Sequence, residues 1–406
     1  MKSMESALRR VLLYSHDTYG LGHLRRNLAI AEHLLAGHSN LQIVLMTGSS
    51  VADRFDIPSR LKIVQLPPVI KFGNEDYRSR DPRWSIDLVR RSRIAIMKDT
   101  ARRFQPDVFL VDHAPQGMKK ELLPVFDVLR ATSPATRIVL GLRDVIDTPE
   151  VVRQHWHEAG IYETLDEVYD RILVYGRAEL FDVTELYGLA DTVASKLTYC
   201  GYVSRHHADD PQRSRKEDFV LGISGGGGDG ADVLSATLSA CAALAQRCVV
   251  MTGPLMGDVD RRALALQVAT HPLASIVEFV ADPSDLMRRA SVVVTMGGYN
   301  SLCELVALDA PTIVIPRVEP RQEQVIRAQI FAQLGAVTVE LPGKALAARL
   351  SGTLARVLET PPATKTATLD LGGLIKVANA LEVEARASRG SRTTVRTPQM
   401  LPEVSR

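Results

Sequence analysis

The stretch SVVVTMGGYNSLCE, residues 291–304, decides the fold of this chain. Its β-branched run predicts a buried strand over Ser291–Thr295, and the paired glycines Gly297 and Gly298 predict a tight turn. The residues that follow predict a helix capped by Ser301. Strand, glycine turn and helix in this order form the unit from which parallel sheets covered by helices are built.

Similar apolar runs recur along the chain, separated by helix-length segments, and predict two Rossmann-like α/β domains facing each other across a cleft. The expected domains are residues 1–203 and 219–385, joined by a polar linker at 204–218 and followed by a basic, mobile tail at 386–406. The predicted strands are Val11–Tyr14, Gln42–Met46, Leu61–Val64, Asp107–Val111, Arg137–Leu140, Arg171–Val174, Phe219–Ser224, Cys248–Thr252, Ser275–Phe279, Ser291–Thr295 and Thr312–Pro316.

Composition excludes several classes of protein. The 49 basic and 47 acidic residues give a formal charge of +2, which is too balanced to favour a nucleic-acid partner. The four cysteines lack the spacing of a metal site and are interpreted as reduced thiols. No run is long enough for a signal peptide or a membrane span, so we expect a cytoplasmic protein, with peripheral contact at the inner face of the membrane as an option.

The first candidate loop follows the first strand. Gly20 and Gly22 allow a ligand to approach the backbone closely, and His23 is expected in the first turn of the helix Leu24–Leu35. The positive end of the helix dipole favours a neutral imidazole there, which can accept a proton. His23 is therefore a candidate general base, and the alternative is a histidine that only braces the loop.

The second candidate loop is rich in glycine. Ser224, Gly225, Gly226 and Gly227 follow a strand and precede a helix expected to start near Asp232, so backbone amides there can cradle phosphate oxygens. The loop is not a Walker P-loop, because no Lys-Ser or Lys-Thr closes it, and it supports a dinucleotide fingerprint only weakly. A flexible turn is the alternative.

In the third loop, Gly297, Gly298 and Asn300 lead to Ser301 and Glu304. The helix start can bind a diphosphate, and a carboxylate at position 304 can accept hydrogen bonds from two ribose hydroxyls. Ser301 and Glu304 also have the spacing of a capping box, which the segment alone favours.

Other polar residues are placed near the predicted cleft. Asp112 can orient a base or bind an acceptor hydroxyl, or it can cap the next turn. Arg317 and Arg321 can meet a diphosphate, although solvated surface positions are the ordinary alternative for each. Asp258 and Asp260 form a DxD, interpreted as acidic residues at a helix start, and no metal site is predicted.

These segments together resemble glycosyltransferase family 28, a group with the two-domain GT-B fold. Gly20-Leu21-Gly22-His23 is similar to the family's first loop, and Gly20-x-Gly22-His23-x-x-Arg26 also resembles a nucleotide-sugar hydrolase, which adds Arg26 as a candidate diphosphate contact. The likeness extends over Phe279-Val280, Gly297-Gly298, Ser301, Glu304 and Gln324, and it implies that Glu304 binds the ribose and Gln324 the donor sugar. Glu323, a further candidate donor contact beside Gln324, and Arg327 depart from the family's His and Asn.

The resemblance implies transfer of a sugar from a nucleoside-diphosphate sugar, with UDP as the expected nucleotide, to a hydroxyl acceptor with inversion. Backbone amides would stabilise the leaving group, so neither a metal nor a cofactor beyond the nucleotide-sugar cosubstrate is expected. A lipid-linked or surface-polysaccharide precursor is the candidate acceptor. Two alternatives stay open, namely a nucleotide-sugar hydrolase or non-hydrolysing epimerase on the same fold, and a non-catalytic nucleotide-sugar sensor.

Overall fold

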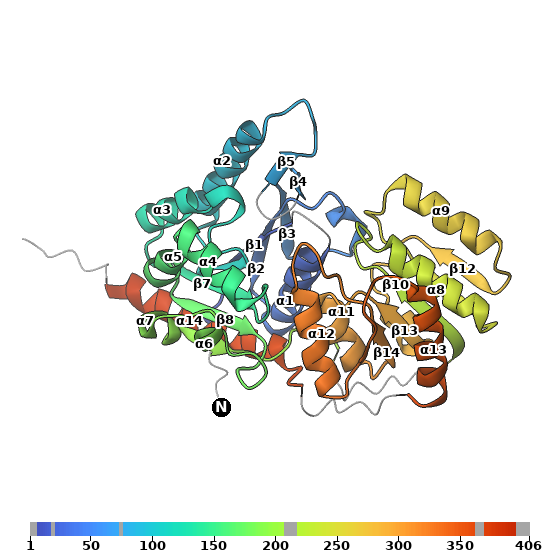
Figure 1. Cartoon of the computed structure of the whole chain (residues 1–406). Coiled ribbons are helices and arrows are strands. Elements are labelled where there is room, and N and C mark those ends of the chain that lie inside the picture. Colours follow the sequence, from blue (N-terminus) through green and yellow to red (C-terminus); the bar gives the residue numbers. More distant parts are fainter. Residues whose placement is uncertain (1–5, 18–20, 73–75, 207–216, 362–368, 395–406) are drawn as a thin grey trace, which may run out of the picture.

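Two parallel sheets, each covered by helices on both faces, form the two lobes of the computed structural model (Figure 1). The structure describes residues 6–17, 21–72, 76–206, 217–361 and 369–394. Each predicted strand overlaps an observed strand, and the α/β fold class is confirmed. Buried parallel strands have no polar face, which is why they appear in the sequence as continuous apolar runs.

The first sheet has the order β3-β2-β1-β6-β7-β8-β9. Its strands are β1 (Arg10–Ser15), β2 (Gln42–Thr47), β3 (Leu61–Gln65), β6 (Val108–Asp112), β7 (Arg137–Arg143), β8 (Arg171–Tyr175) and β9 (Leu197–Tyr199). A separate antiparallel hairpin, β4 (Val69–Phe72) with β5 (Asp76–Ser79), projects beside α2 (Ile86–Phe104) (Figure 1). The remaining helices of this lobe are α1 (Gly22–Gly37), α3 (Leu123–Thr132), α4 (Pro149–Ala159), α5 (Ile161–Glu167), α6 (Val183–Leu186) and α7 (Asp191–Ala194).

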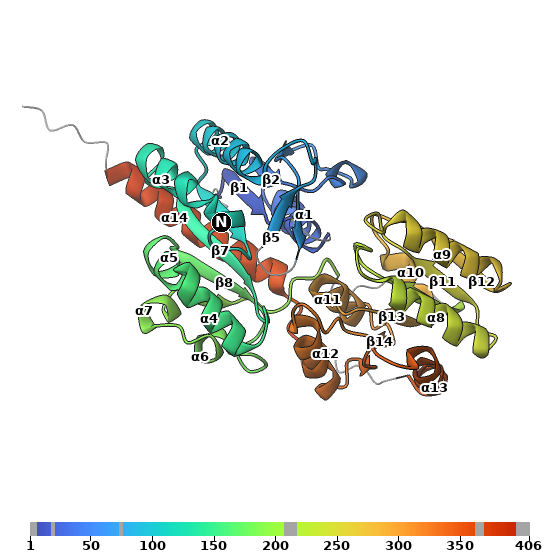
Figure 2. The same ribbon diagram turned by 45° about the horizontal axis from the view of Figure 1, so that its top comes forward.

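The second sheet has the order β12-β11-β10-β13-β14-β15. Its strands are β10 (Glu217–Ile223), β11 (Cys248–Met251), β12 (Ala274–Val277), β13 (Ala290–Thr295), β14 (Thr312–Val314) and β15 (Thr338–Val339). The helices around it are α8 (Ala231–Ala243), α9 (Asp258–Ala269), α10 (Ser284–Arg289), α11 (Tyr299–Ala307), α12 (Glu323–Gln333) and α13 (Leu346–Glu359). Figure 2 shows the two lobes side by side, with α11 and α12 on the side of the second lobe that faces the first.

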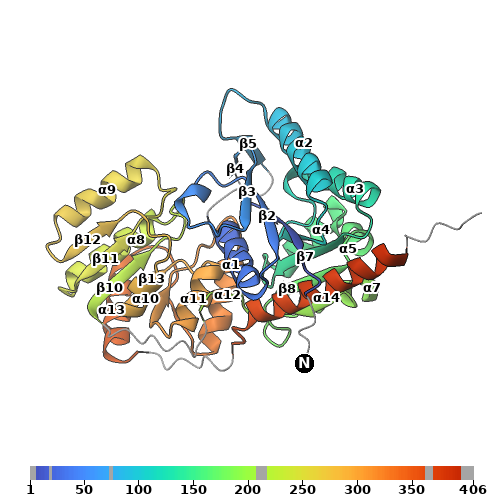
Figure 3. The same cartoon turned by 180° about the vertical axis from the view of Figure 1, so that it is seen from behind.

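The C-terminal helix differs from the sequence prediction. α14 (Gly373–Thr394) continues through the start of the segment predicted as a mobile tail, and residues 395–406 lie outside the described part of the chain. α14 packs on α1, β6 and β7, so it belongs to the first lobe, as the view from behind shows (Figure 3). Leu381, Ala385 and Ser388 on α14 are fully buried, and this packing holds a helix in a segment whose composition had predicted disorder.

Two chain segments therefore cross between the lobes. The outgoing segment follows β9, and the returning one precedes α14. They run antiparallel, with a bridge between Val203 and Gly372 and a hydrogen bond of 2.7 Å from the Tyr202 amide to the Asp370 carbonyl oxygen. Of the predicted linker, residues 207–216 lie outside the description, and β10 already begins at Glu217.

Candidate active site between the lobes

A cavity of about 670 Å³ lies between the two lobes, beyond the carboxyl ends of both sets of strands. Ligands of open parallel sheets bind at this edge, because helix N-termini with unpaired N–H groups point at it. Basic side chains outnumber acidic ones in the lining. The basic ones are Arg25, Arg26, Lys119, Lys120, Arg143, Arg317 and Arg321, and the acidic ones are Asp229, Glu319 and Glu323.

Most of the predicted site residues meet at this cavity. Its lining includes Gly22, His23, Arg26, Ser224, Gly225, Gly226, Gly298, Asn300, Ser301, Arg317, Arg321, Glu323 and Gln324. Gly227, Gly297, Asp112 and Glu304 are not part of the lining, and Gly20 lies outside the described residues. The functional roles assigned to these residues stay predictions.

Two of the predicted glycines serve the turns rather than the cavity wall. Gly227 and Gly297 have φ values of 94° and 77°, in the left-handed region that favours glycine. A Cβ atom on Gly227 would lie 2.1 Å from the Thr252 carbonyl oxygen, and one on Gly297 would lie 2.5 Å from Val314 Cγ1. Both residues are therefore glycine because the backbone turns tightly and packs closely there.

His23 stands at the start of α1, as predicted, and its partner is Asp112 at the end of β6. His23 Nδ1 lies 2.6 Å from Asp112 Oδ2. Burial raises the pKa of Asp112, but the positive charges of Arg26 and His23 lower it by more, so the pKa lies below its ordinary value. An ionised carboxylate accepts the Nδ1 proton, which leaves Nε2 as the nitrogen that can accept a proton.

Arg26 completes this cluster. Its Nε and Nη2 atoms donate to Asp112 Oδ1 and Oδ2 at 2.9 and 2.8 Å, a bidentate pair that is almost fully buried. The Arg26 guanidinium also lies 5.5 Å from the ring centroid of Tyr299 on α11. Arg26 thus lines the cavity while two of its nitrogen atoms hold the carboxylate of Asp112.

The predicted capping box on α11 is wrong. Gly298 is the N-cap of α11, and Ser301 is the third helical residue. The carboxylate of Glu304 instead accepts from Arg25 Nη2 on α1, with Oε1 at 3.2 Å and Oε2 at 3.0 Å. Nearby, Asn300 Nδ2 donates to the Gly22 carbonyl oxygen at 2.7 Å, so the N-terminal ends of α1 and α11 are joined directly.

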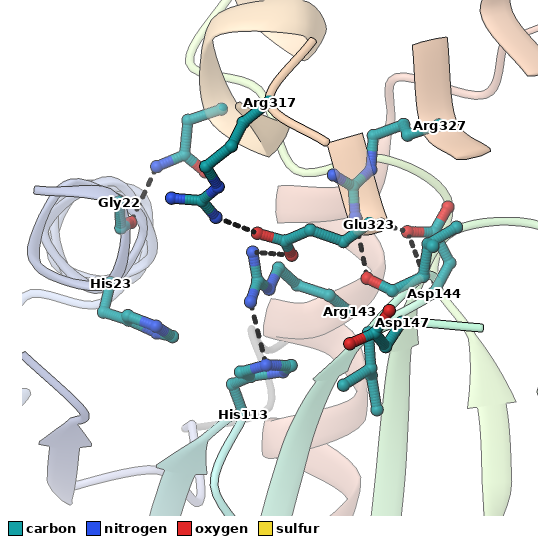
Figure 4. Close-up of polar contacts among 12 residues, drawn as sticks. Gly22, His23, His113, Arg143, Asp144, Asp147, Arg317, Glu323 and Arg327 are labelled. Atoms are coloured by element: carbon teal, nitrogen blue, oxygen red, sulfur yellow. Dashed lines mark hydrogen bonds and ion pairs between the residues drawn. The ribbon is translucent and has the colours of Figure 1, made fainter. Parts of the chain in front are cut away.

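A second set of contacts joins the lobes on the far side of the cavity (Figure 4). Arg143, at the end of β7, pairs with Glu323 at 2.9 Å, and Arg327 lies 3.5 Å from Asp144 and donates to the Val145 carbonyl oxygen at 2.9 Å. Burial lowers the pKa of Arg143 to about 10. This value is still well above neutral pH, so the guanidinium stays charged.

The two departures from the family pattern are thus explained together. Glu323 and Arg327 lie one turn apart on α12, and their charges match Arg143 and Asp144 across the interface. Burial raises the pKa of Glu323, but the surrounding arginines, Arg143 foremost, outweigh it and bring the pKa below its ordinary value. These two positions hold the lobes together through charge.

Arg317 and Gln324 connect this interface to the glycine-rich loop. Arg317 Nη1 pairs with Asp229 at 2.8 Å, and its backbone amide donates to Gln324 Oε1 at 2.9 Å. Arg317 and Arg321, two of the three arginines predicted to contact a diphosphate, both line the cavity, and Arg317 already has these protein partners.

His113 was not among the predicted site residues. Its Nε2 accepts from Arg143 Nη2 at 2.8 Å, and its ring centroid lies 5.5 Å from that of His23. Figure 4 shows the His23 ring directed from α1 toward His113 and Arg143. Burial, followed by the charge of Arg143, holds the pKa of His113 well below its ordinary value. His113 also adopts a φ of 67°, which is uncommon outside glycine and is often found at functional sites.

The low pKa of His113 predicts a stability that depends on pH. Below about pH 6.5 the unfolded chain protonates this histidine while the folded chain does not, so the free energy of unfolding should fall as the pH falls. His113→Asn, which tolerates the same φ, removes this contribution. We expect the melting temperature of the wild type to drop more steeply between pH 7.5 and 5.5 than that of His113→Asn. Equal slopes would contradict this assignment.

The other side of the cavity is formed by the first lobe alone. Of the apolar residues that line the cavity there, Ile146 is partly exposed, whereas Trp156 and Ile161 are buried. Lys119 and Lys120, which also belong to the lining, are exposed. His155 and Trp156 lie on α4, and His155 also lines the cavity. Asp258 and Asp260, the DxD, are exposed in the first turn of α9 and do not line the cavity.

Two features of the described residues bear on the expected partners. None of the helices described is long and apolar enough to cross a membrane. Within the same part of the chain, no group of three or more His, Cys, Asp or Glu side chains is arranged to hold a metal ion.

Residues 223–373 match the model of the glycosyltransferase family 28 C-terminal domain. A curated relative from Pasteurella multocida (strain Pm70), UDP-N-acetylglucosamine--N-acetylmuramyl-(pentapeptide) pyrophosphoryl-undecaprenol N-acetylglucosamine transferase, is 30% identical over 115 residues. This match spans 28% of the chain and 32% of the relative, about a third of its length.

Solved structures resemble the whole chain. UGT71G1 of Medicago truncatula, complexed with UDP-glucose, aligns with a TM-score of 0.58 at 13% identity, covering 95% of this chain and 100% of its own. MurG of Acinetobacter baumannii aligns with a TM-score of 0.52 at 12% identity, covering 95% of this chain and 99% of its own. At such low identity the likeness establishes the fold, which is GT-B, as predicted.

Proposed function

We propose that this chain, whose residues 223–373 match the glycosyltransferase family 28 C-terminal domain and whose fold is GT-B, transfers a sugar from a UDP-sugar to a hydroxyl acceptor. The observation that carries the proposal is the His23–Asp112 dyad, whose His23 lines the same cavity as the amide-rich start of α11 in the other lobe. A base and an anion-binding helix start facing one cavity are the two elements that glycosyl transfer from a nucleotide sugar requires.

In this mechanism the acceptor hydroxyl gives its proton to His23 Nε2 as its oxygen attacks the anomeric carbon. The bond between that carbon and the diphosphate oxygen breaks, and UDP leaves with the negative charge. Attack from the face opposite the leaving group inverts the anomeric carbon. Asp112 stabilises the imidazolium that forms, as the acidic member of a catalytic triad does.

The leaving diphosphate is stabilised by charge and by backbone amides. The starts of α1 and α11 and the Ser224–Gly226 loop border the cavity, and each presents N–H groups without helical partners. Arg321 and the other basic residues of the lining add positive charge. Such preorganised donors supply the stabilisation for which other glycosyltransferases use a divalent cation, so we propose that the reaction needs no metal.

The acceptor is proposed to bind in the part of the cavity that the first lobe forms alone. Ile146 offers a partly exposed apolar side chain there, and the exposed Lys119 and Lys120 suit an anionic group. This combination supports a lipid-linked or surface-polysaccharide precursor, and with it a cytoplasmic protein that contacts the inner face of the membrane peripherally.

The test is an assay of sugar transfer. The purified chain is incubated with one radiolabelled UDP-sugar at a time and with hydroxyl acceptors that include polyprenyl-linked saccharides. We expect label to appear on an acceptor with stoichiometric release of UDP, at a rate that EDTA does not change. Free labelled sugar formed without any acceptor would favour the hydrolase, and tight binding without turnover would favour the sensor.

A glycine at the start of α11 provides a second test of donor placement. Gly298 lines the cavity, and a Cβ atom added to it meets nothing within 4 Å. Gly298→Val should therefore leave the fold intact but fill space that the diphosphate needs, weakening UDP binding by about tenfold or more in titration calorimetry. Undiminished affinity would place the diphosphate elsewhere.

The matched control is Gly257→Val. Gly257 is the N-cap of α9 with φ −63° and ψ 151°, almost the backbone conformation of Gly298, at −58° and 148°. It does not line the cavity, so the same substitution there should leave UDP affinity unchanged.

A further inference from the structure

The carboxylate proposed to bind the ribose already has a partner from the other lobe. Both oxygens of Glu304 accept from Arg25 Nη2, at 3.2 and 3.0 Å, and both side chains are largely buried, with 7% and 14% exposed. Glu304 does not line the cavity, whereas Arg25 does. Arg25 therefore both lines the cavity and holds this carboxylate.

Arg25 has hydrogen-bonding capacity left over. Its Nε atom is buried and has no hydrogen-bond partner among the described residues. A buried donor without an acceptor is costly, so a ligand oxygen that reaches this guanidinium gains more than one that reaches a solvated arginine. Phosphate oxygens suit it best, because a planar guanidinium binds them with charge-assisted hydrogen bonds.

Ribose and Arg25 compete for the same two oxygens. A carboxylate that binds the two ribose hydroxyls uses both of its oxygens, and both are held here by one nitrogen of Arg25. The start of α1 lies next to the start of α11 through the 2.7 Å contact between Asn300 and Gly22, so a guanidinium that leaves Glu304 remains beside two helix N-termini. These are the groups proposed to hold the diphosphate.

We propose that Arg25 is exchanged between the two parts of the donor: the ribose displaces it from Glu304, and the diphosphate then binds its guanidinium. This inference rests on the proposed nucleotide-sugar donor and adds Arg25 as a donor-binding residue. Its consequence is a preference for nucleotides that bring both parts. A nucleoside has to break the Arg25–Glu304 pair and offers the arginine no new partner, whereas a nucleoside diphosphate replaces the lost partner.

The test compares uridine and UDP as ligands of the full chain in titration calorimetry. In Arg25→Met the carboxylate is no longer occupied and the guanidinium is missing, so uridine should bind about tenfold more tightly and UDP about tenfold more weakly than in the wild type. Arg25→Gln, which keeps a polar side chain, should behave like Arg25→Met, with tighter binding of uridine and weaker binding of UDP. Arg262→Met, at an exposed position of α9, should change neither.

Opposite changes for the two ligands cannot arise from general loosening of the fold, which weakens both. The inference is overturned if the wild type binds UDP but the Arg25 variants bind uridine and UDP with unchanged affinities or with affinities changed in the same direction. A wild type that binds no UDP overturns the proposed donor itself, which is a different result.

Discussion

His23→Ala is expected to lower turnover by about 10²–10⁴-fold while leaving the affinity for the UDP-sugar nearly unchanged, because the imidazole acts on the acceptor proton. In the structure its Nδ1 is held by Asp112 at 2.6 Å, so its other nitrogen is the one that can take the proton. Steady-state kinetics of the variant should therefore show a reduced kcat and a similar donor KM.

Glu304→Ala is the contrasting variant. Glu304 lies on the donor side and contacts neither His23 nor Asp112 in the structure, so its loss should weaken donor binding more than turnover. Equal and small effects of the two substitutions on turnover would contradict both roles.

Asp112→Asn is expected to have the second large effect, on turnover and on stability at once. The amide cannot stabilise the imidazolium, and turnover should fall by about 10²-fold or more. The same change removes the bidentate partner of buried Arg26 and should cost about 3 kcal/mol of unfolding free energy, because it leaves a buried charge uncompensated. Steady-state kinetics measure the turnover, and denaturant unfolding of the same preparation measures the free energy of unfolding.

Asp107→Asn separates the two effects. Asp107 immediately precedes the same strand, β6, at the end away from the cavity, and its Oδ2 accepts from the Arg9 and Arg10 amides at 3.0 and 2.9 Å. This variant should lose stability but keep the turnover of the molecules that remain folded. If the two variants lowered turnover alike, the effect of Asp112→Asn would have to be assigned to stability.

Much of the fold could be predicted because the signals are local. A strand buried on both faces, such as Val292–Val294, has to be apolar throughout, and glycines such as Gly297 are required where the turn is tight. The hairpin of β4 and β5 and the short edge strands β9 and β15 escaped prediction because their sequences carry polar residues and few apolar ones in a row. The helical state of residues 386–394 could not be predicted, because α14 packs on α1, which is far away in the sequence.

The site could be predicted only in part, for a related reason. His23, Gly298 and Gln324 stand in motifs whose residues are neighbours in the sequence. Arg25, Arg143 and His113 owe their importance to contacts with residues of other segments, namely Glu304, Glu323 and Arg143, and their neighbours in the sequence do not reveal these contacts. The misassigned capping box shows the same limit, because Ser301 and Glu304 have the right spacing but the helix starts at Tyr299.

The most direct test of the central claim is a crystal structure of the chain with UDP. The account predicts the diphosphate at the joined starts of α1 and α11, beside Gly298, with the ribose hydroxyls on Glu304 and His23 facing the distal phosphate from the first lobe. UDP bound on a surface that includes neither Gly298 nor the His23 side of the cavity would contradict the account.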